Sequence, residues 1–458
     1  MTCSIQELFE KLPRAAVNRL GRTLHPLARS HGLTYADETG QIEVITLTLR
    51  PRVIPKKRMD AIAKIVRILD SAFRKIAALY FKNPSLPELL PFTPQERDWL
   101  SCLRGPDYRP GQVISRWDAN TTFGKRAWKE GFSFFEVNGV GVGGLWYGSA
   151  AAEVSLKSVV PELRKIEPQF RPVLFHDMRR LLLERLLAQR RRLKRTRGVI
   201  ALVMERASGS NYIEFECLAK LYHELGYASL VCEPTDFILK KGELVSRGKI
   251  VDVIYRDTTL SELCLFEAKG HDLSALREAF RRGQALSSLE GEFDHKSVFE
   301  VFTNPEYAYA FTAKERELFK RHILWTRLLG ERKTTDIKGK EVDLIPFVLR
   351  HQTDLVLKPN RLYGGKGVVF GREAKRSEWE RKIETGLKES GEWVIQQLGR
   401  LRKRSFFRGG AKSAQKKDYY VVSGFFATEK GIGIVGRMSE RTVVNVARQG
   451  GLTPILFI

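Results

Sequence analysis

The region from residue 198 to residue 256 constrains the fold most, because strand patterns alternate there with a helix pattern. GVIALVME, which begins at Gly198, is apolar almost throughout, as strands buried on both faces are. IEFECLAKLYHELG has helical spacing and ends at Gly226, and YASLVCEP and KIVDVIYRD are further strand patterns. Such alternation predicts a parallel sheet with right-handed crossovers. We therefore expect an α/β (α+β) fold.

A second mixed block runs from residue 355 to residue 458 and has more antiparallel character. Its strand patterns are TDLVLKP, EWVIQQL, YYVVSGFFA, GIGIVGRM and RTVVNVA, and KRSEWERKIETGL is a helix pattern. FFATEKGIGIV predicts two strands joined by a tight turn. The basic segment RLRKRSFFRGGAKSAQKKDYY predicts a mobile loop. Phe406 and Phe407 in this loop would either stack on bases or anchor it to the body.

The rest of the chain divides by its patterns into further units. Residues 1–110 are predicted to be a mixed α/β region, in which apolar residues recur at helical spacing from Ile62 to Ile76. Residues 111–197 contain the strand patterns QVISRWD and FSFFEVN and a helix with the basic end QRRRLKRTR. We expect residues 198–300 to form the parallel-sheet unit and residues 301–458 to form the last unit.

Net charge is the one unusual bulk property of the chain. Its 78 Lys and Arg residues against 53 acids give a net charge of +25. A surface of this kind attracts polyanions, so nucleic acid or an acidic partner stays open as a partner.

Cysteine usage and hydropathy bear on where the protein works. The five cysteines are scattered and form no C-x-x-C pair, which argues against a zinc site or a disulfide framework. No apolar run approaches 18 residues, and the N-terminus lacks the pattern of a signal peptide. We expect no membrane span and a reducing, cytoplasmic location.

The stretch FFEVNGVGVGGLWYG, residues 134–148, has two interpretations. Gly139, Gly141 and Gly144 match G-x-G-x-x-G, the dinucleotide fingerprint of an oxidoreductase. That interpretation needs a helix opening at the glycines and an acid about 20 residues further on. Glu162 has the required distance, but Pro161 and a helical pattern occupy the place of the strand that should carry the acid.

The second interpretation concerns the strand before these glycines. Glu136 and Asn138 lie at positions i and i+2, so both side chains leave the same face. A carboxylate and an amide oxygen suit Mg²⁺, which also takes oxygens from nucleotide phosphates. Arg116 and Asp118 share a face of the neighbouring strand pattern in the same way. Polar groups on apolar strands are costly to bury unless they face a ligand.

TDLVLKPNRLYGGKGVVFG, residues 353–371, predicts a phosphate-binding hairpin. A strand delivers Lys358, and the turn Gly364–Gly367 lets backbone N–H groups approach phosphate oxygens closely. The segment is not a P-loop, because the spacing differs and a strand follows where a P-loop has a helix. The alternative is a Gly-rich hairpin with incidental lysines.

Two further strand ends carry polar groups. Gln396 and Gln397 end the strand in EWVIQQLGR and could read an adenine by hydrogen bonds. Arg437 lies on a short strand, and Asn445 and the pair Gly450–Gly451 follow it. An arginine beside a Gly-rich turn suits an acyl phosphate or a tetrahedral intermediate, because charge developing on oxygen needs preorganised donors.

In their order along the chain, these motifs resemble the circularly permuted ATP-grasp ligases, the group of glutathionylspermidine synthase-like proteins and eukaryotic-type glutathione synthetase. The resemblance rests on R-x-D, F-x-E-x-N followed by Gly-Gly, L-x-L-K-P with its Gly-rich loop, and the terminal Gly-Gly strand. In ordinary ATP-grasp enzymes the E-x-N pair follows the lysine loop, whereas here it precedes Lys358 by more than two hundred residues. The resemblance spans roughly residues 110–458 and also includes VDVIYRD and ERELFKRHILWTRLL.

The resemblance implies a permuted ATP-grasp fold with a pre-ATP-grasp-like substrate domain. It also implies an ATP- and Mg²⁺-dependent carboxylate–amine ligase that forms an amide through an acyl phosphate. The implied metal ligands are Glu136 and Asn138, and the implied catalytic residues are Arg437 and Lys358. The implied nucleotide-binding residues are Lys320 (with Lys314 as the alternative), Lys358, Gly364, Gly365, Lys366, Gly367, Gln396, Gln397 and Leu398. The implied substrate-binding residues are Arg116, Asp118, Arg256, Gly450 and Gly451.

Two departures from these families affect the expected substrate. Gly141 and Val142 stand where glutathione synthetases carry serines that touch the dipeptide, and NRLY, residues 360–363, lacks the metal-binding acid that follows K-P. We therefore expect small-molecule carboxylate and amine or peptide substrates, but not glutathione as the product. The alternative is a catalytically altered nucleotide-binding protein whose basic surface contacts nucleic acid or an acidic partner.

Overall fold

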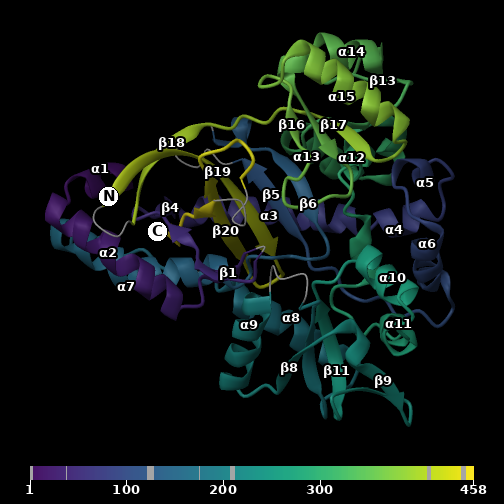
Figure 1. Ribbon diagram of the computed structural model, residues 1–458, viewed down its shortest axis with the longest axis horizontal. Helices are drawn as coiled ribbons and strands as arrows, with labels where there is room; N and C mark the ends of the chain where they lie inside the picture. Colours follow the sequence, from purple (N-terminus) through teal and green to yellow (C-terminus); the bar gives the residue numbers. More distant parts are fainter. Residues whose placement is uncertain are drawn as a thin grey trace.

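A largely antiparallel sheet at the centre of the molecule joins strands from distant parts of the chain (Figure 1). The computed structural model describes residues 4–37, 39–120, 128–174, 176–206, 212–409, 414–444 and 450–458. The central sheet has the order β3 (Thr46–Leu47), β21 (Gly451–Leu452), β20 (Ile432–Ser439), β19 (Gln415–Ala427), β5 (Arg116–Asn120) and β6 (Phe134–Asn138). Only β3 and β21 pair in parallel.

Two hydrophobic cores cover the two faces of this sheet. Phe425 and Ile434 belong to one core, and their chain neighbours Phe426 and Val435 belong to the other, as the two-residue period of strands requires. Helix α3 (Lys56–Phe73) packs on the first face. Helices α7 (Tyr147–Ile166) and α8 (Met178–Arg192) pack on the second, with α2 (Arg14–Ser30) against α7.

The expected parallel sheet is present in what we call the parallel-sheet lobe, residues 198–285, at the bottom of Figure 1. Its order is β8 (Ser229–Cys232), β7 (Val199–Val203), β11 (Lys249–Arg256), β10 (Glu243–Ser246) and β9 (Phe237–Lys240). Strand β7 pairs in parallel with β8 and β11, which confirms the prediction, and β9 and β10 add an antiparallel edge. Its helices are α9 (Tyr212–Glu224), α10 (Leu260–Ala268) and α11 (Ser274–Arg281).

The four-stranded lobe, residues 324–398, lies at the top of Figure 1. Its antiparallel order is β12 (Thr326–Leu328), β17 (Trp393–Gln397), β15 (Leu355–Pro359) and β16 (Val369–Phe370). Trp325, Trp379 and Ile395 belong to its own small core. The hairpin β13 (Lys333–Thr335) and β14 (Glu341–Asp343), α14 (Leu344–Arg350) and α15 (Arg376–Lys388) complete the lobe.

The N-terminal region forms one two-stranded sheet of its own and also pairs with strands from the end of the chain. Strand β4 (Arg52–Ile54) pairs in parallel with β22 (Ile455–Phe457), so the two ends of the chain are joined. The apolar stripe from Ile62 to Phe73 is buried on α3, as its spacing predicts. The remaining elements are α1 (Ile5–Glu10), β1 (Thr34–Ala36), β2 (Ile42–Val44), α4 (Ile76–Tyr80), α5 (Leu86–Leu89), α6 (Pro94–Ser101), α12 (Val298–Thr303) and α13 (Ala313–His322).

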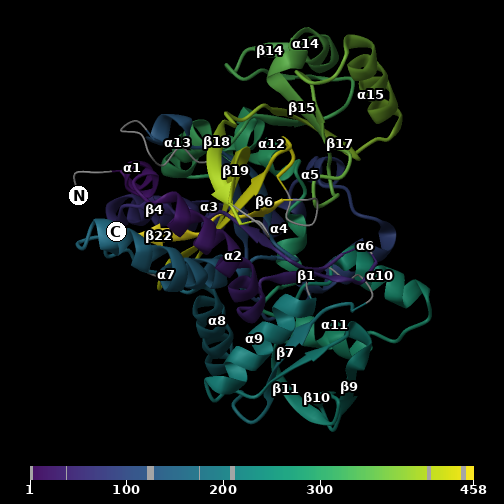
Figure 2. The ribbon, with the colours of Figure 1, turned by 60° about the vertical axis from the view of Figure 1, so that its left-hand side comes forward.

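Two predictions about the C-terminal block are wrong. The segment predicted as a mobile loop contains β18 (Lys403–Arg408), which pairs with β19 to form the hairpin that curves over α1 and α2 in Figure 2. Phe406 is buried with Tyr419 and Val421, so it anchors the hairpin to the body. Residues 441–444 of the predicted strand RTVVNVA are not a strand, and Asn445 lies outside the described residues.

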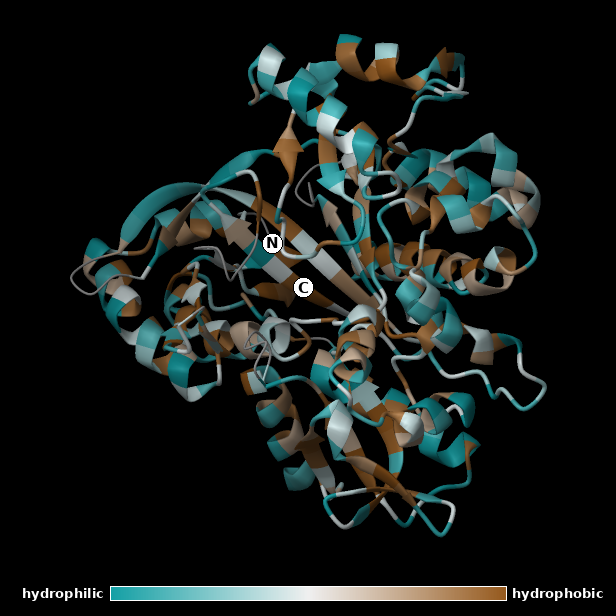
Figure 3. Cartoon of the chain, turned by 45° about the vertical axis from the view of Figure 1, so that its right-hand side comes forward, coloured by the Kyte–Doolittle hydropathy of each residue, from teal (hydrophilic) through white to brown (hydrophobic). Residues whose placement is uncertain are grey.

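Apolar residues are concentrated in the sheets, and the outer helices show polar faces (Figure 3). Among the residues that the structure describes, no helix combines the length and the hydropathy needed to cross a membrane.

Candidate functional site

The central sheet and the two lobes line one shared cavity of about 700 Å³. The central sheet contributes Arg116, Glu136, Asn138 and Arg437, and the four-stranded lobe contributes Lys358. The structure therefore brings together motifs that are separated by more than three hundred residues in the sequence. The other predicted residues that line the cavity are Gly364, Gly365, Lys366, Gln396, Gln397 and Leu398.

A β-bulge sets the direction of the side chains on β6. Asp118 faces Glu136 across the β5–β6 pair, but its neighbour Ala119 faces Phe134, so Phe135 is an extra residue. Trp117, Phe134 and Val137 therefore pack in the core, while Phe135 and Glu136 both line the cavity. The bulge also exposes the Phe135 carbonyl to the four-stranded lobe, where Lys358 and Gln396 contact it at 3.5 and 3.2 Å.

Asp118 is fully buried beneath the cavity and orients two arginines. Its carboxylate accepts hydrogen bonds from Arg116 Nε at 2.8 Å and from Arg437 Nη2 at 2.6 Å. Burial opposes ionisation, but these two guanidinium groups hold the pKa of Asp118 below its usual value. Asp118 is thus a positioning residue, and the two arginines reach the cavity. The buried Nε of Arg437 forms no hydrogen bond within the described part of the chain.

Glu136 and Asn138 present oxygen atoms to the same part of the cavity. The Asn138 amide nitrogen donates to the Arg116 carbonyl and to Asp118, each at 3.3 Å. Since the nitrogen is used in this way, the Asn138 side-chain oxygen is the atom left for a ligand. Glu136 Oε1 forms an ion pair with Lys296 Nζ at 3.1 Å. No cluster of three metal-binding His, Cys, Asp or Glu side chains occurs among the described residues, so this pair would need phosphate oxygens and water to complete a Mg²⁺ shell.

Lys358 is held at the cavity wall by a chain of polar contacts. Its Nζ donates to Gln396 Oε1 at 2.6 Å, and Gln396 Nε2 donates to Thr326 Oγ1 at 2.9 Å. Burial and the charge of Lys296 favour the neutral amine, and although Glu136 opposes this, the pKa of Lys358 is lowered to about 8. A buried lysine in this state gains its proton most favourably when an anion binds beside it.

The glycine turn between β15 and β16 meets the C-terminal segment over the cavity. Gly364, Gly365 and Gly367 have φ values of +69°, +71° and +73°, which glycine adopts without strain. A side chain at Gly365 would clash with Val443, so these two segments touch only because position 365 has no Cβ.

The glycines after β6 are held by two carboxylates from elsewhere in the chain. Glu214 on α9 accepts the N–H groups of Gly144 at 2.9 Å and Trp146 at 2.8 Å. Asp294 accepts the Gly139 N–H at 2.7 Å. Burial, the main cause in each case, raises the pKa of each carboxyl to about 7.

The dinucleotide interpretation of these glycines is not supported. Helix α7 does open after them, but β5 and β6 are antiparallel, and no described strand of this sheet pairs in parallel with β6. Glu162 lies on α7 itself, where it pairs with Arg19 at 3.1 Å and with Lys165 at 2.9 Å.

The predicted adenine hinge is part of a central strand. The N–H of Gln397 donates to Trp325 at 2.8 Å, and the N–H of Leu398 donates to Asp354 at 2.7 Å. These backbone donors are therefore used within the sheet. Gly399 and Leu401, which follow the strand, also line the cavity.

The structure does not bring several predicted residues to the cavity surface. Arg256 is fully buried, where it pairs with Glu292 at 2.5 Å and donates to backbone carbonyls, so it is not placed to hold a substrate carboxylate. Lys320 and its alternative Lys314 are exposed on α13 and do not line the cavity. Gly367, Gly450 and Gly451 lie beside it without lining it, and Gly451 packs against Thr46.

Sequence reasoning missed the cavity residue Lys296, as it missed the lining acids Glu205, Asp257 and Glu262. Lys296 lies in EGEFDHKS, residues 290–297, a run that is almost wholly buried although half of its residues are charged. Its Nζ contacts Glu136 and also donates to the Leu362 carbonyl at 2.6 Å. A polar run of this kind in the middle of a globular chain is a detectable signal, because buried charges require partners.

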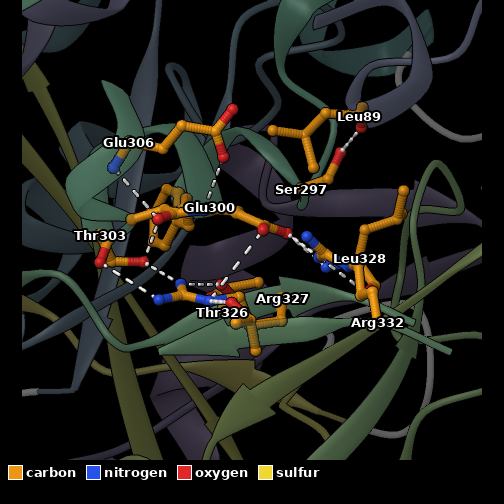
Figure 4. Close-up of polar contacts among 12 residues, drawn as sticks. Leu89, Ser297, Glu300, Thr303, Glu306, Thr326, Arg327, Leu328 and Arg332 are labelled. Atoms are coloured by element: carbon orange, nitrogen blue, oxygen red, sulfur yellow. Dashed lines mark hydrogen bonds and ion pairs between the residues drawn. The ribbon is translucent and has the colours of Figure 1, made fainter. Parts of the chain in front are cut away.

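The segment WTR, residues 325–327, supports the cavity from behind. Arg327 and Glu300 are fully buried, and Arg327 donates to Thr303, Thr326, Thr334 and Thr335 in the network partly shown in Figure 4. Glu300 accepts the Leu328 N–H at 2.6 Å and pairs with Arg332 at 2.7 Å. This network joins α12 to β12, and β12 presents Thr326 to Gln396.

Comparisons with known proteins identify a shared fold but no family. No protein-family model matches the sequence, and no curated protein matches it. A glutathione synthetase-like effector from Globodera pallida, solved in its apo form, aligns with 98% of this chain and 98% of its own at a TM-score of 0.68 and 12% identity. A candidate gamma-glutamylcysteine synthetase from Methylobacillus flagellatus aligns with 84% of this chain and 86% of its own at 12% identity, but its TM-score of 0.40 is too low to carry an argument. The first likeness extends along the whole chain and shows the fold alone.

Proposed function

We propose that the protein is an ATP- and Mg²⁺-dependent carboxylate–amine ligase with a circularly permuted ATP-grasp fold. The observation that carries this proposal is the shared cavity, where the central sheet offers two oxygen ligands and two arginines and the segments packed against it offer two lysines. The fold that the chain shares with a glutathione synthetase-like protein supports the same class of reaction.

The cavity residues divide between nucleotide and acyl substrate. Lys358 and Lys296 are the cations for the ATP phosphates, and the Gly364–Gly367 turn would cover them with its N–H groups. Glu136 and Asn138 would hold Mg²⁺, which neutralises phosphate charge when bound. Arg116 and Arg437, fixed by Asp118, would bind the substrate carboxylate and the phosphoryl group.

The reaction needs no nucleophilic side chain. A substrate carboxylate oxygen attacks the γ-phosphorus of ATP, the bond to ADP breaks, and an acyl phosphate forms. The amine nitrogen of the second substrate then attacks the acyl carbon, and the amide forms as phosphate leaves and a proton is released. The protein contributes position and charge neutralisation, which account for most of catalysis in phosphoryl transfer.

ADP release with Mg-ATP and a panel of amino acids, polyamines and short peptides tests the proposal. At least one pair of acid and amine should stimulate ADP release and yield an amide detectable by mass spectrometry. Lys358→Met and Glu136→Ala should abolish this turnover, whereas Lys320→Met, which alters an exposed lysine outside the cavity, should retain it. Turnover that survives both cavity substitutions would show that the site is elsewhere.

One observation favours a second function, nucleotide binding without ligation. Leu362 and Tyr363 occupy the segment in which the resembling enzymes carry a third metal ligand, and Leu362 is 53% exposed. Tight Mg-ATP binding without turnover on any acceptor, together with binding to RNA or to an acidic protein, would select this function over the ligase.

A further inference from the structure

A second cavity, of about 480 Å³, lies at the edge of the parallel-sheet lobe, and four of its nine lining residues are arginines. It forms where the 106–109 loop, the segment that follows α8 and the end of α11 meet. Its charged lining residues are Arg109, Arg195, Arg281, Arg282 and Asp107, so four guanidinium groups face one carboxylate.

The two cavities lie toward opposite ends of the parallel sheet. Arg195 precedes the first residue of β7, whereas Asp257, which lines the first cavity, follows the last residue of β11. Since β7 and β11 are parallel, the length of a five-residue strand, about 16 Å, separates these two positions. The second cavity is therefore not an extension of the candidate ligase site.

Contacts between its three segments hold the second cavity in shape. The Arg109 N–H donates to the Arg281 carbonyl at 2.9 Å. Gly283, with φ of +67°, lets the loop approach the end of α11, because a Cβ there would lie 2.6 Å from the Arg109 carbonyl oxygen. Gln189 on α8 donates to the Gly283 carbonyl, and Arg192 donates to the Pro110 carbonyl. These contacts fix the backbone positions from which the arginine side chains extend.

The positive charge of this cavity is only partly neutralised by the protein. Arg109 is exposed and forms no ion pair with any described residue. Arg195 pairs with Glu243 and, through Nε at 3.9 Å, with Asp252, a carboxylate that it shares with Arg190. Arg281 and Arg282 share Glu278 at 2.6 and 2.5 Å, and Arg281 also pairs with Asp107 at 3.6 Å. The basic run of α8 continues this charge over the neighbouring surface.

We propose that this arginine-lined cavity binds a compact polyvalent oxyanion of the phosphate ester or polyphosphate class. Guanidinium groups match phosphate oxygens in bidentate geometry. Four of them, from three separate segments of the sequence, line this cavity. The volume is that of a small-ligand site. Nucleic acid is disfavoured, because the one aromatic lining residue, Tyr108, is half-buried and hydrogen-bonded to Glu290, and so offers no platform for a base.

Calorimetric titration with tripolyphosphate, without Mg²⁺ or ATP, tests this inference. The titration uses the Lys358→Met protein, so that phosphate binding in the first cavity is weakened, at about 0.15 M salt. We expect one saturable site, and binding at least about tenfold weaker when Arg109→Gln and Arg281→Gln are added. Arg22→Gln with Arg29→Gln, two exposed arginines on α2, is the charge-matched control and should leave binding unchanged.

The outcomes separate this inference from the proposed ligase function. Arg109→Gln alone removes an exposed side chain without an ion pair, so a weakened site in that folded variant supports the proposal even if the double variant is unstable. Equal weakening by the α2 control would show general charge attraction. If the wild type binds tripolyphosphate and Lys358→Met abolishes that binding, the ligand occupies the first cavity and not the second. Arginine-dependent binding of single-stranded RNA without tripolyphosphate binding would assign the surface to nucleic acid. Each of the last three results overturns the inference and leaves the ligase proposal intact.

Discussion

Asp118 is the single residue on which the arrangement of the cavity floor most depends. It is fully buried and pairs with both Arg116 and Arg437. Asp118→Asn leaves two largely buried guanidinium groups without their counter-charge, so we expect a loss of about 3–5 kcal/mol in the free energy of unfolding. Urea denaturation measures this loss. The control Asp98→Asn alters an aspartate that is 68% exposed and paired with Arg277, and it should cost less than about 1 kcal/mol. Similar losses for the two variants would contradict the structural role assigned to Asp118.

Lys358 should make nucleotide affinity depend on pH. Its pKa of about 8 in the free protein means that the ammonium form, which phosphates require, is lost as the pH rises above that value. The dissociation constant for a non-hydrolysable Mg-ATP analogue should therefore rise by up to about tenfold per pH unit above pH 8 and stay nearly flat below it. Calorimetry across this range tests the prediction. Lys358→Arg keeps its charge, so its affinity should lack this slope, and an equal slope in both proteins would assign the titration to another group.

At the scale of elements, a chain of hydrogen bonds connects the strands β12, β17 and β15 and ends at Lys358, the lysine proposed to bind phosphate. Thr326 accepts from Gln396, which in turn accepts from Lys358. Thr326→Val removes the hydroxyl while it keeps the shape, so we expect roughly fivefold weaker nucleotide binding from the loss of one neutral hydrogen bond. Thr326→Ser retains the hydroxyl and should bind as the wild type does. If valine and serine at this position behave alike in the binding assay, the contact does not position Lys358.

The hairpin turn over the cavity provides a test with a matched glycine pair. Gly365 and Gly339 both have positive φ, at +71° and +84°, but a Cβ at Gly365 would strike Val443, whereas a Cβ at Gly339 meets nothing within 4 Å. Alanine at either position should cost roughly 1–2 kcal/mol of stability from the backbone alone. Only Gly365→Ala should also raise the KM for ATP, by about tenfold or more, because it separates two segments that meet over the site. Steady-state kinetics after a thermal-melt check distinguishes the two effects.

The elements show which parts of the site could be read from sequence. Arg116 with Asp118 and Glu136 with Asn138 were recognisable because a strand has a period of two, and Lys358 because a strand and a glycine turn flank it. The bulge at Phe135 could not be predicted, since one inserted residue leaves no pattern in the sequence. Hairpin β18–β19 was missed because its many charges concealed the few residues, such as Phe406 and Tyr419, that bury one face.

At the scale of the whole molecule, the site depends on how distant segments meet, and motifs alone do not determine this. Arg256 occupies a motif position but lies buried beside Glu292, while Lys296 belongs to no recognised motif and reaches Glu136. The order of strands in the central sheet also lies beyond sequence reasoning, because β19 pairs with β5 across roughly three hundred residues of chain. Long-range pairings of this kind are selected by the packing of complete cores on both sheet faces.

Two buried carboxyls that join the parts of the molecule around the cavity should make its stability depend on pH. Glu214 connects α9 to the start of α7, and Asp294 connects residue 139 to the segment that carries Lys296. Burial raises the pKa of each to about 7, above the ordinary values of 4.5 and 3.8 that apply in the unfolded chain. At a pH between the unfolded-state and folded-state pKa values, the folded protein keeps protons that the unfolded chain has released. The stability that the two carboxyls contribute is therefore complete below about pH 4 and is lost as the pH rises through 7.

Urea unfolding of wild type and of the double variant Glu214→Gln/Asp294→Asn, between about pH 5 and 7.5, measures this effect. As the pH rises, each carboxyl lowers the free energy of unfolding by up to about 1.4 kcal/mol per pH unit. The double variant should lack this decrease because its amides do not titrate. Other groups titrate in both proteins, so the difference between the two curves isolates the pair. Glu317→Gln, at a residue that is 66% exposed, should follow the wild-type curve. Parallel curves for wild type and the double variant would mean that Glu214 and Asp294 are ionised in the folded state, and that the lobes are joined around the cavity by charged rather than protonated carboxyls.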